Sequence, residues 1–216
     1  MTLRNIDLVM FDLDGTLADT GRDLADAVNY TRAHFNLAPL SPGTVHSNVG
    51  RGVEHLLKQS LPDNSADRFQ EAMRVFLDRY ENHLVDNTVL YPGVREVLTH
   101  FRSKRRAVVS NKMHRLTVAL LHGLGVAKEF DVVLGGDSAP QKKPHPAMIQ
   151  DVLSRFQILP AQALIVGDGD TDIEAGKRAG VWTCGVTYGL GNRAELIASA
   201  PDVLIDDLTQ LSHYFR

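Results

Sequence analysis

Short, mostly apolar runs separated by helical patterns are the feature of this sequence that most constrains its fold. They occupy residues 6–11, 107–109, 132–134, 163–166, 181–186 and 203–205. Continuous apolar character over so few residues is typical of strands that are buried on both faces. Such strands, alternating with helices, form a parallel sheet with a helical layer on each side. We therefore expect an α/β fold with a doubly wound parallel sheet.

Helical patterns fill most of the gaps between these runs. Apolar residues recur at helical spacing in segments 94–101, 115–125, 147–156 and 172–180. The last of these segments ends in Gly180, which is the residue type that most often terminates a helix. The pattern thus predicts helices that connect successive parallel strands.

The gap after the first run is too long for a simple crossover, because about ninety residues separate the first two predicted strands. Within it, segments 19–35, 52–61 and 68–85 have helical patterns, and no convincing strand stands out. We expect residues 19–88 to be a helical insertion on the loop after the first strand. The core domain would then comprise residues 1–18 and 89–216.

Composition and charge exclude several classes of function. The 216 residues carry 23 basic and 26 acidic side chains, and the net charge of −3 argues against nucleic acid as a partner. No apolar run approaches the ~20 residues that span a bilayer. Acidic residues interrupt the N-terminal apolar stretch, which argues against a signal peptide. The single cysteine, Cys184, cannot form an internal disulfide, and its strand-like surroundings predict a buried, inert thiol. We expect a soluble, cytoplasmic monomer or homodimer without a membrane partner.

Polar side chains follow four of the predicted strands at the point where each strand ends. They are Asp12, Asp14 and Thr16 after the first, Ser110, Asn111 and Lys112 after the second, Lys142 and Lys143 beyond the third, and Asp168, Asp170 and Asp172 after the fourth. Taken singly, each is more often a turn residue, a helix cap or a solvated charge. Ligands of open parallel sheets bind at the carboxyl ends of the strands, so the joint pattern predicts one functional pocket.

Several carboxylates in one pocket would repel one another unless a cation lay among them. Oxygen-only ligands at an open site suit Mg²⁺, which often also binds substrate phosphate. The alternation of aspartates from Asp168 to Asp172 also resembles a calcium-binding EF-hand loop. That loop needs Gly at its sixth position and Glu at its twelfth, where this chain has Ile173 and Ala179. The EF-hand interpretation therefore fails.

Four segments, DLDGT, VVSNK, KKPHP and GDGDTD, resemble the four motifs of the haloacid dehalogenase superfamily in residue identity, order and spacing. The resemblance extends over essentially the whole chain. It implies a Rossmann-like core domain with a small helical cap inserted after the first motif. It also implies Mg²⁺-dependent phosphoryl transfer through an aspartyl-phosphate.

The resemblance implies a role for each matching residue. Asp12 matches the nucleophile, and Asp14 matches the general acid that later serves as the base. Ser110 matches the residue that hydrogen-bonds a phosphoryl oxygen. Lys143 matches the lysine that neutralises the nucleophile and the phosphoryl group, because the Lys-Pro-His-Pro order favours it over its neighbour Lys142.

The implied magnesium ligands are Asp12, the backbone carbonyl of Asp14, Asp168, and Asp172 directly or through water. Whether Asp170 also binds the metal remains open, since it could instead cap the following helix. Two further residues are expected to bind substrate: Thr16, and Asn111 through its backbone amide.

Asp14 also discriminates within the superfamily. Its dehalogenases and phosphonate-cleaving members lack a carboxylate at the matching position, so the resemblance implies hydrolysis of a phosphate ester. The phosphomutase branch retains the pair of carboxylates, and a β-phosphoglucomutase-like reaction therefore stays open. A non-catalytic binding protein on the same fold is a third alternative.

The insertion is expected to select the substrate. Arg51 lies between Gly50 and Gly52, where its guanidinium could bind a substrate carboxylate; the alternative is a turn with a solvated arginine. Four stretches, FDLDGTLADT, VGRG, GGDSAPQKKPHP and VTYGLG, are similar to the phosphoglycolate phosphatase branch. That likeness implies 2-phosphoglycolate as substrate. Another small phosphate, such as a sugar phosphate, nucleotide or pyrophosphate, remains an alternative.

Overall fold

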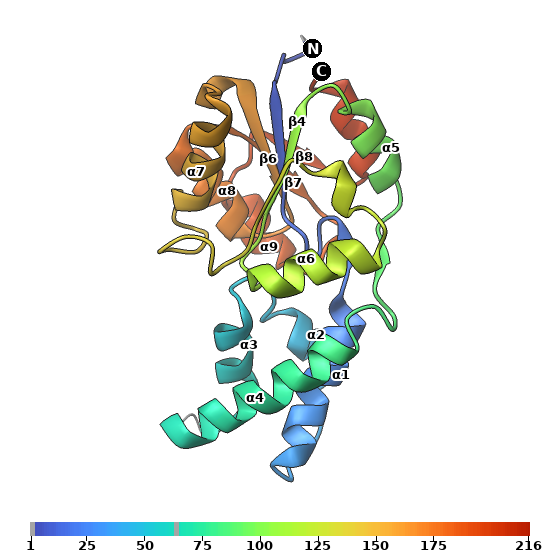
Figure 1. Cartoon of the computed structure of the whole chain (residues 1–216), viewed down its shortest axis with the longest axis vertical. Helices are drawn as coiled ribbons and strands as arrows, with labels where there is room; N and C mark the ends of the chain where they lie inside the picture. Colours follow the sequence, from blue (N-terminus) through green and yellow to red (C-terminus); the bar gives the residue numbers. More distant parts are fainter. Residues whose placement is uncertain (1–2, 63–64) are drawn as a thin grey trace.

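A six-stranded parallel sheet forms the centre of the computed structural model, which describes residues 3–62 and 65–216 (Figure 1). Its strands in this part of the chain are β1 (Leu8–Phe11), β4 (Arg105–Val109), β5 (Val132–Leu134), β6 (Ala163–Gly167), β7 (Trp182–Val186) and β8 (Val203–Ile205). Their order is β5-β4-β1-β6-β7-β8 with every pairing parallel. Because β1 lies in the middle, the chain winds outward in both directions. The predicted α/β, doubly wound sheet is confirmed.

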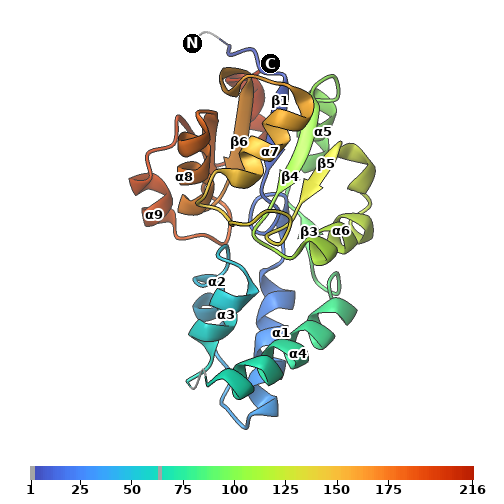
Figure 2. The ribbon, with the colours of Figure 1, turned by 60° about the vertical axis from the view of Figure 1, so that its left-hand side comes forward.

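Both faces of the sheet are buried, which explains the continuous apolar runs. Leu8 and Met10 of β1 belong to the apolar cluster formed with α7 (Ala147–Phe156) and α8 (Asp170–Ala179). Val9 and Phe11 belong to the cluster formed with α5 (Val94–His100) and α6 (His114–Gly123). Successive side chains of a strand point to opposite faces, so each face of β1 requires apolar residues. Figure 2 shows these two helical layers on either side of the sheet.

The helices predicted between the strands are confirmed, with ends that differ by a few residues. The structure adds α9 (Arg193–Ala198) and three short 3₁₀ helices, η1 (Ala127–Glu129), η2 (Pro160–Gln162) and η3 (Leu208–His213), which the sequence pattern did not indicate. Elements of three to six residues are too short to show a helical period. No helix in the described ranges is long and apolar enough to cross a bilayer.

Within the described part of residues 20–88, the chain forms four helices: α1 (Gly21–His34), α2 (Pro42–His46), α3 (Val53–Ser60) and α4 (Ala66–Asn82). We call residues 21–82 the insertion. It lies beyond one end of the sheet, and the C-terminus lies at the opposite end beside the first described residues of the chain (Figure 1). Its apolar side chains join the same cluster as Val9 and Phe11, so the insertion packs against the core rather than standing free.

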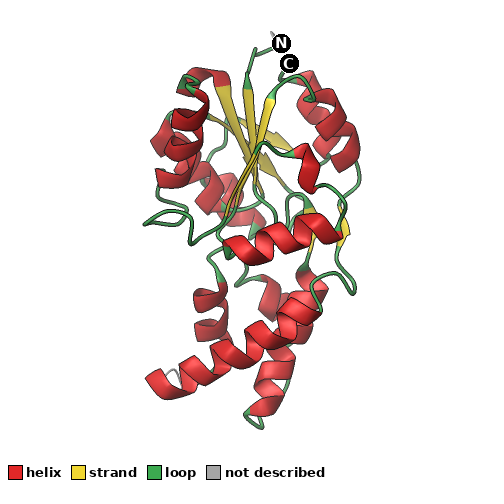
Figure 3. Ribbon diagram, viewed as in Figure 1, coloured by secondary structure: helices red, strands yellow, loops and turns green. Residues whose placement is uncertain are grey.

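The two connections to the insertion pair with each other. β2 (Ala18–Asp19) runs antiparallel to β3 (Val89–Leu90), and Figure 3 shows this short ribbon between the sheet and the insertion. The expectation that no strand lies within residues 19–88 is therefore wrong at Asp19, the second residue of β2. A two-residue strand leaves no alternation in the sequence, and its pairing depends on a partner about seventy residues away.

Asp23, in the first turn of α1, fixes the returning connection. Its buried carboxylate accepts hydrogen bonds from the backbone N–H and the side-chain amide of Asn87, and from the backbone N–H and hydroxyl of Thr88. Burial by itself would raise the pKa of Asp23, but these donors outweigh burial and lower the pKa below 3.8. The ionised carboxylate is therefore the form that stabilises the contact between α1 and the returning connection.

We expect Asp23→Asn to lower the free energy of unfolding by roughly 1–3 kcal/mol at neutral pH, because an amide cannot accept all of these hydrogen bonds. A group whose pKa is lowered on folding stabilises the fold above its unfolded value, and this contribution is lost as the pH falls through the folded value. The deficit should therefore shrink as the pH falls below 3.8. Urea denaturation at several pH values measures it.

Asp26→Asn is the matched control, since Asp26 is exposed on the same helix. It should leave the free energy of unfolding close to that of the wild type. An equal loss in both variants, or a deficit of Asp23→Asn that does not change with pH, would contradict the assigned role of Asp23.

Candidate active site

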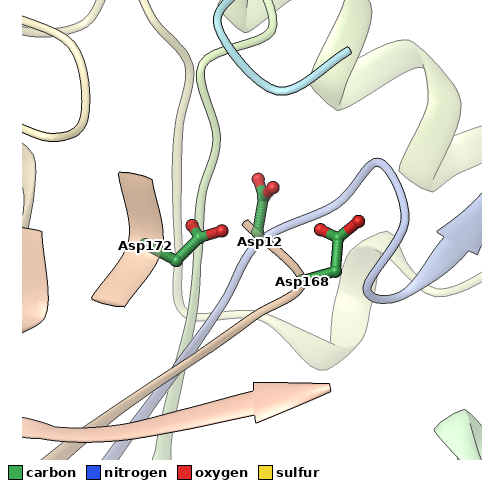
Figure 4. A group of neighbouring side chains, drawn as sticks. All are labelled: Asp12, Asp168 and Asp172. Atoms are coloured by element: carbon green, nitrogen blue, oxygen red, sulfur yellow. The ribbon is translucent and has the colours of Figure 1, made fainter. Parts of the chain in front are cut away.

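Three buried carboxylates converge at the carboxyl edge of the sheet. Asp12 follows β1, Asp168 follows β6, and Asp172 lies in the first turn of α8. Each offers one oxygen, and these oxygens lie within 4.8 Å of one another. Figure 4 shows the three side chains turned toward a common space from separate segments of the chain. The predicted meeting of strand ends therefore occurs for these residues.

Two glycines allow the carboxylates to approach so closely. Gly15 has a positive φ of 82°, and a Cβ atom there would lie 2.0 Å from an oxygen of Asp168. A Cβ atom on Gly167 would lie 2.1 Å from the carboxyl carbon of Asp172. Any side chain at either position would displace a carboxylate of the cluster, which explains why the turns after β1 and at the end of β6 carry glycine.

The Asp168 carboxylate is held by neutral donors. Its Oδ2 accepts hydrogen bonds from the backbone N–H groups of Leu190 (2.8 Å) and Gly191 (2.9 Å), and its Oδ1 accepts one from the Thr16 hydroxyl (3.1 Å). Burial is the largest influence on this group. Together with the negative charge of Asp12, burial raises the pKa of Asp168 to about 7.

Lys143 supplies the nearest positive charge. Its ammonium nitrogen lies 3.1 Å from Oδ1 of Asp12 and 2.6 Å from Oδ1 of Asp172, and it also donates to the backbone carbonyl of Val109. Burial by itself would lower the pKa of Lys143, but the two aspartates outweigh burial and raise it. Burial nevertheless raises the pKa of Asp172 to about 6 despite the Lys143 charge. One lysine therefore does not fully offset the crowding of the carboxylates.

The residues of this cluster fit a divalent cation. Oδ1 of Asp12 is buried and makes no hydrogen bond within the described part of the chain, although it lies 3.1 Å from the Lys143 ammonium. A buried oxygen left without a donor is one that a cation or an incoming reactant can use. The cluster consists of carboxylates alone, which is the ligand chemistry of hard cations such as Mg²⁺.

Asp14 is not one of these three clustered carboxylates, and its hydrogen-bond partners are different. Its Oδ1 accepts hydrogen bonds from the Thr20 hydroxyl (2.7 Å) and the Lys112 ammonium (2.9 Å), and its Oδ2 lies 3.0 Å from the same ammonium. Lys112 has no role predicted from the sequence. The available signal was a lysine directly after Ser110 and Asn111 at a strand end, where a long cationic side chain can turn back into the pocket.

A pocket of about 480 Å³ empty volume, its open mouth included, adjoins these groups between the sheet and the insertion. From the core it is lined by Asp12, Asp14, Ser110, Asn111, Lys112, Met113 and Leu116. From the insertion and the loop before α3 it is lined by Leu24, Val49, Gly50, Gly52, Val53, Leu56, Phe76 and Tyr80. The side chains that the insertion contributes are apolar except for Tyr80. The pocket therefore joins a polar floor to a largely apolar roof.

Three further residues of the core domain were predicted to contact substrate: Ser110, Asn111 and Thr16. Ser110 is buried and lines the pocket, as expected. The side chain of Asn111 instead joins loops: its amide donates to the carbonyls of Gly50 and Lys143, and its oxygen accepts from the Lys143 N–H, each at 2.9 Å. The Thr16 hydroxyl is engaged by Asp168, and Thr16 is not among the residues that line the pocket.

Arg51 reaches the core but not the pocket. Its guanidinium lies 2.8 Å from Oδ2 of Asp170, and the flanking Gly50 and Gly52 line the pocket while Arg51 does not. Asp170, whose role the sequence left open, thus pairs with the insertion and lies outside the carboxylate cluster. Cys184 is buried as predicted, and burial raises the pKa of its thiol.

Comparison with known proteins identifies the family. Residues 9–186 match the model of the haloacid dehalogenase-like hydrolases. The chain belongs to this family. All four motifs singled out in the sequence fall within the matched residues, so the resemblance to the haloacid dehalogenase superfamily is confirmed.

Individual relatives match the chain over nearly its whole length. A phosphoglycolate phosphatase of Chromobacterium violaceum is 36% identical, with 98% of this chain and 97% of that protein covered. One from Pseudomonas putida is 38% identical, with 94% and 78% covered. The crystal structure of "a predicted phosphoglycolate phosphatase" from Haemophilus somnus is 32% identical, has a TM-score of 0.93, and covers 96% of this chain and 97% of its own.

We expect saturating Mg²⁺ to raise the melting temperature of this hydrolase by roughly 5–10 °C, because a bound cation relieves the repulsion among the three carboxylates. Asp168→Asn should abolish most of the shift, since it removes one ligand of the cluster. Differential scanning fluorimetry of EDTA-treated protein, with and without MgCl₂, measures the shift.

Asp170→Asn is the matched control, because Asp170 neighbours the cluster in sequence but pairs with Arg51. It should keep the Mg²⁺-dependent shift. A wild-type protein that does not respond to Mg²⁺, or equal responses in the two variants, would count against a cation site at the cluster.

Proposed function

We propose that this phosphatase hydrolyses small phosphomonoesters through an aspartyl-phosphate on Asp12, with Mg²⁺ as cofactor and 2-phosphoglycolate as substrate. The observation that carries the proposal is the state of Asp12. Its Oδ1 is buried without a hydrogen bond, beside the Lys143 ammonium, and Asp12 lines the pocket. A carboxylate that lines the pocket beside an ammonium group is suited to attack phosphorus, because the positive charge favours its ionised form and the approach of a phosphate group.

Mg²⁺ would be held by the side chains of Asp12, Asp168 and Asp172 together with the backbone carbonyl of Asp14. The bound cation would neutralise the carboxylates and the negative charge of the phosphoryl group. This ligand set extends the observed cluster by one carbonyl, which the family resemblance implies.

In the first step, an oxygen of Asp12 attacks phosphorus and the bond between phosphorus and the ester oxygen breaks. Lys143 offsets the charge of the transferring group, and the Ser110 hydroxyl donates to one of its oxygens. Asp14 gives a proton to the departing alkoxide, which would otherwise be a poor leaving group. The alcohol leaves, and the phosphoryl group stays on Asp12.

In the second step, Asp14 accepts a proton from a water molecule that attacks phosphorus. The acyl phosphate bond breaks, inorganic phosphate leaves, and the Asp12 carboxylate is restored. The proton that Asp14 gave up in the first step is thereby recovered. The same carboxylate serves both steps because its proton is returned once in each turnover.

Two observations favour a small leaving group. The insertion offers apolar side chains to the pocket apart from Tyr80, so a sugar would find few hydrogen-bond partners there. The relatives that match nearly the whole chain are named for phosphoglycolate, a small acid. We propose that residues 19–88 act as a cap over the leaving group and that residues 1–18 and 89–216 carry the chemistry.

Asp12→Asn should lower kcat by more than about a thousandfold without loss of structure, because the amide cannot form the covalent intermediate. Phosphate release from 2-phosphoglycolate and from p-nitrophenyl phosphate, together with circular dichroism, provides the measurement. Asp7→Asn is the matched control, since Asp7 lies at the other end of β1 with a 53% exposed side chain, and it should keep wild-type activity. Substantial turnover by pure Asp12→Asn would overturn the proposal.

Arg51→Gln should lower kcat/KM for 2-phosphoglycolate and for p-nitrophenyl phosphate by the same factor. The reason is that Arg51 pairs with Asp170 and does not line the pocket, so its loss weakens the contact between insertion and core for every substrate. Steady-state kinetics on the two esters measures the ratio. A selective loss for 2-phosphoglycolate would instead support the sequence-based expectation that Arg51 binds the substrate carboxylate.

A further inference from the structure

We infer that Lys112 and Tyr80 are positioning residues for Asp14, and that they make its proton transfers depend on contact between the insertion and the core. The inference rests on the proposed function, since it assumes that Asp14 is the acid and base of the reaction. Lys112 ends the VVSNK segment without an assigned role, and Tyr80 lies outside all four segments.

Three side chains form a continuous buried network. The Lys112 ammonium lies 2.9 and 3.0 Å from the two oxygens of Asp14 and 2.9 Å from the Tyr80 hydroxyl. It also lies 4.7 Å from the centre of the Tyr80 ring, within the range of a cation–π contact. All three residues are at most 9% exposed. A buried ammonium without such partners would be costly, so these contacts determine where Lys112 lies.

The network joins the two parts of the molecule. Asp14 and Lys112 follow β1 and β4 of the sheet, whereas Tyr80 belongs to α4 of the insertion. The Tyr80 ring stacks on Phe76 of the same helix at 5.5 Å, so its hydroxyl is fixed relative to the insertion. If the insertion swings away from the sheet, the hydroxyl leaves Lys112.

The contacts also distinguish the two oxygens of Asp14. Oδ1 accepts from both Thr20 and Lys112, whereas Oδ2 contacts Lys112 alone among the described residues. Oδ2 therefore keeps the greater capacity to exchange a proton with the leaving group or with water. An ammonium that contacts both oxygens also limits rotation of the carboxylate. Thr20 directly precedes α1, so a second contact of Asp14 comes from the connection to the insertion.

The Tyr80 hydroxyl is a neutral partner in this network. Burial raises the pKa of Tyr80 to about 12, so the phenol keeps its proton at the pH of catalysis. Tyr80→Phe therefore removes one hydrogen bond to Lys112 without changing the charge, and the ring still packs on Phe76. This makes it a cleaner variant than a replacement of the buried Lys112.

The choice of leaving group separates positioning of Asp14 from a general structural role. An alkoxide needs the Asp14 proton to depart, whereas p-nitrophenolate is stable without it. The ratio kcat/KM reports the steps up to loss of the leaving group, in which Asp14 acts as the acid. Misplacement of Asp14 should thus lower kcat/KM for 2-phosphoglycolate and spare p-nitrophenyl phosphate. A weakened fold or a poorly closing insertion should affect both esters alike.

The experiment compares Tyr80→Phe with wild type on these two esters, in saturating Mg²⁺. We expect kcat/KM to fall about tenfold for 2-phosphoglycolate and by less than about twofold for p-nitrophenyl phosphate. Tyr30→Phe is the matched control, because Tyr30 is 52% exposed on α1 of the same insertion, and it should change neither value. Lys112→Gln should show the same selectivity with a larger loss.

If Tyr80→Phe does not fold, the ratio of the losses on the two esters in Lys112→Gln tests the inference instead. Equal losses on the two esters, or wild-type kinetics in both variants, would overturn the inference and leave the proposed function standing. A wild-type enzyme that hydrolyses neither ester would overturn the proposed function and, with it, this inference.

Discussion

Repulsion among three buried carboxylates is the constraint on which the rest of the site depends. Oxygens of Asp12, Asp168 and Asp172 lie within 4.8 Å of one another, where burial and like charge both oppose ionisation. The fold tolerates this arrangement through the Lys143 ammonium and through backbone amides that donate to Asp168. The remaining imbalance is the physical basis of the cation site that we propose for these three carboxylates.

A second constraint is that two carboxylates two residues apart must do different work. Asp12 and Asp14 diverge after β1: Asp12 lies against Lys143, and Asp14 lies against Lys112. Each acid thus has its own lysine, one from the loop beyond β5 and one from the end of β4. Lys143 bridges Asp12 and Asp172 of the carboxylate cluster, whereas Lys112 contacts the insertion through Tyr80. The proposed division between nucleophile and proton carrier follows from this separation.

The sequence allowed the sheet and the positions of its strand ends to be predicted, because apolar runs and helical periods are local signals. The convergence of Asp12, Asp168 and Asp172 followed from a general rule about parallel sheets. The contacts between the insertion and the core were beyond such reasoning. Arg51 pairs with Asp170, and Lys112 with Tyr80, across segments that lie far apart in the sequence, and a hydrophobic pattern within one segment does not reveal such contacts. The β2–β3 ribbon is too short to show the alternation of a strand. Lys112 therefore had no assigned role before its neighbours were known.

The most direct test of the account is to locate the phosphoryl group during turnover. Enzyme mixed with 2-phosphoglycolate and Mg²⁺ should be quenched in acid within milliseconds, digested, and mapped by tandem mass spectrometry. The account predicts a phosphorylated peptide whose modified residue is Asp12, formed and lost at rates compatible with kcat. Turnover without any phosphorylated enzyme, or modification at a residue other than Asp12, would contradict it.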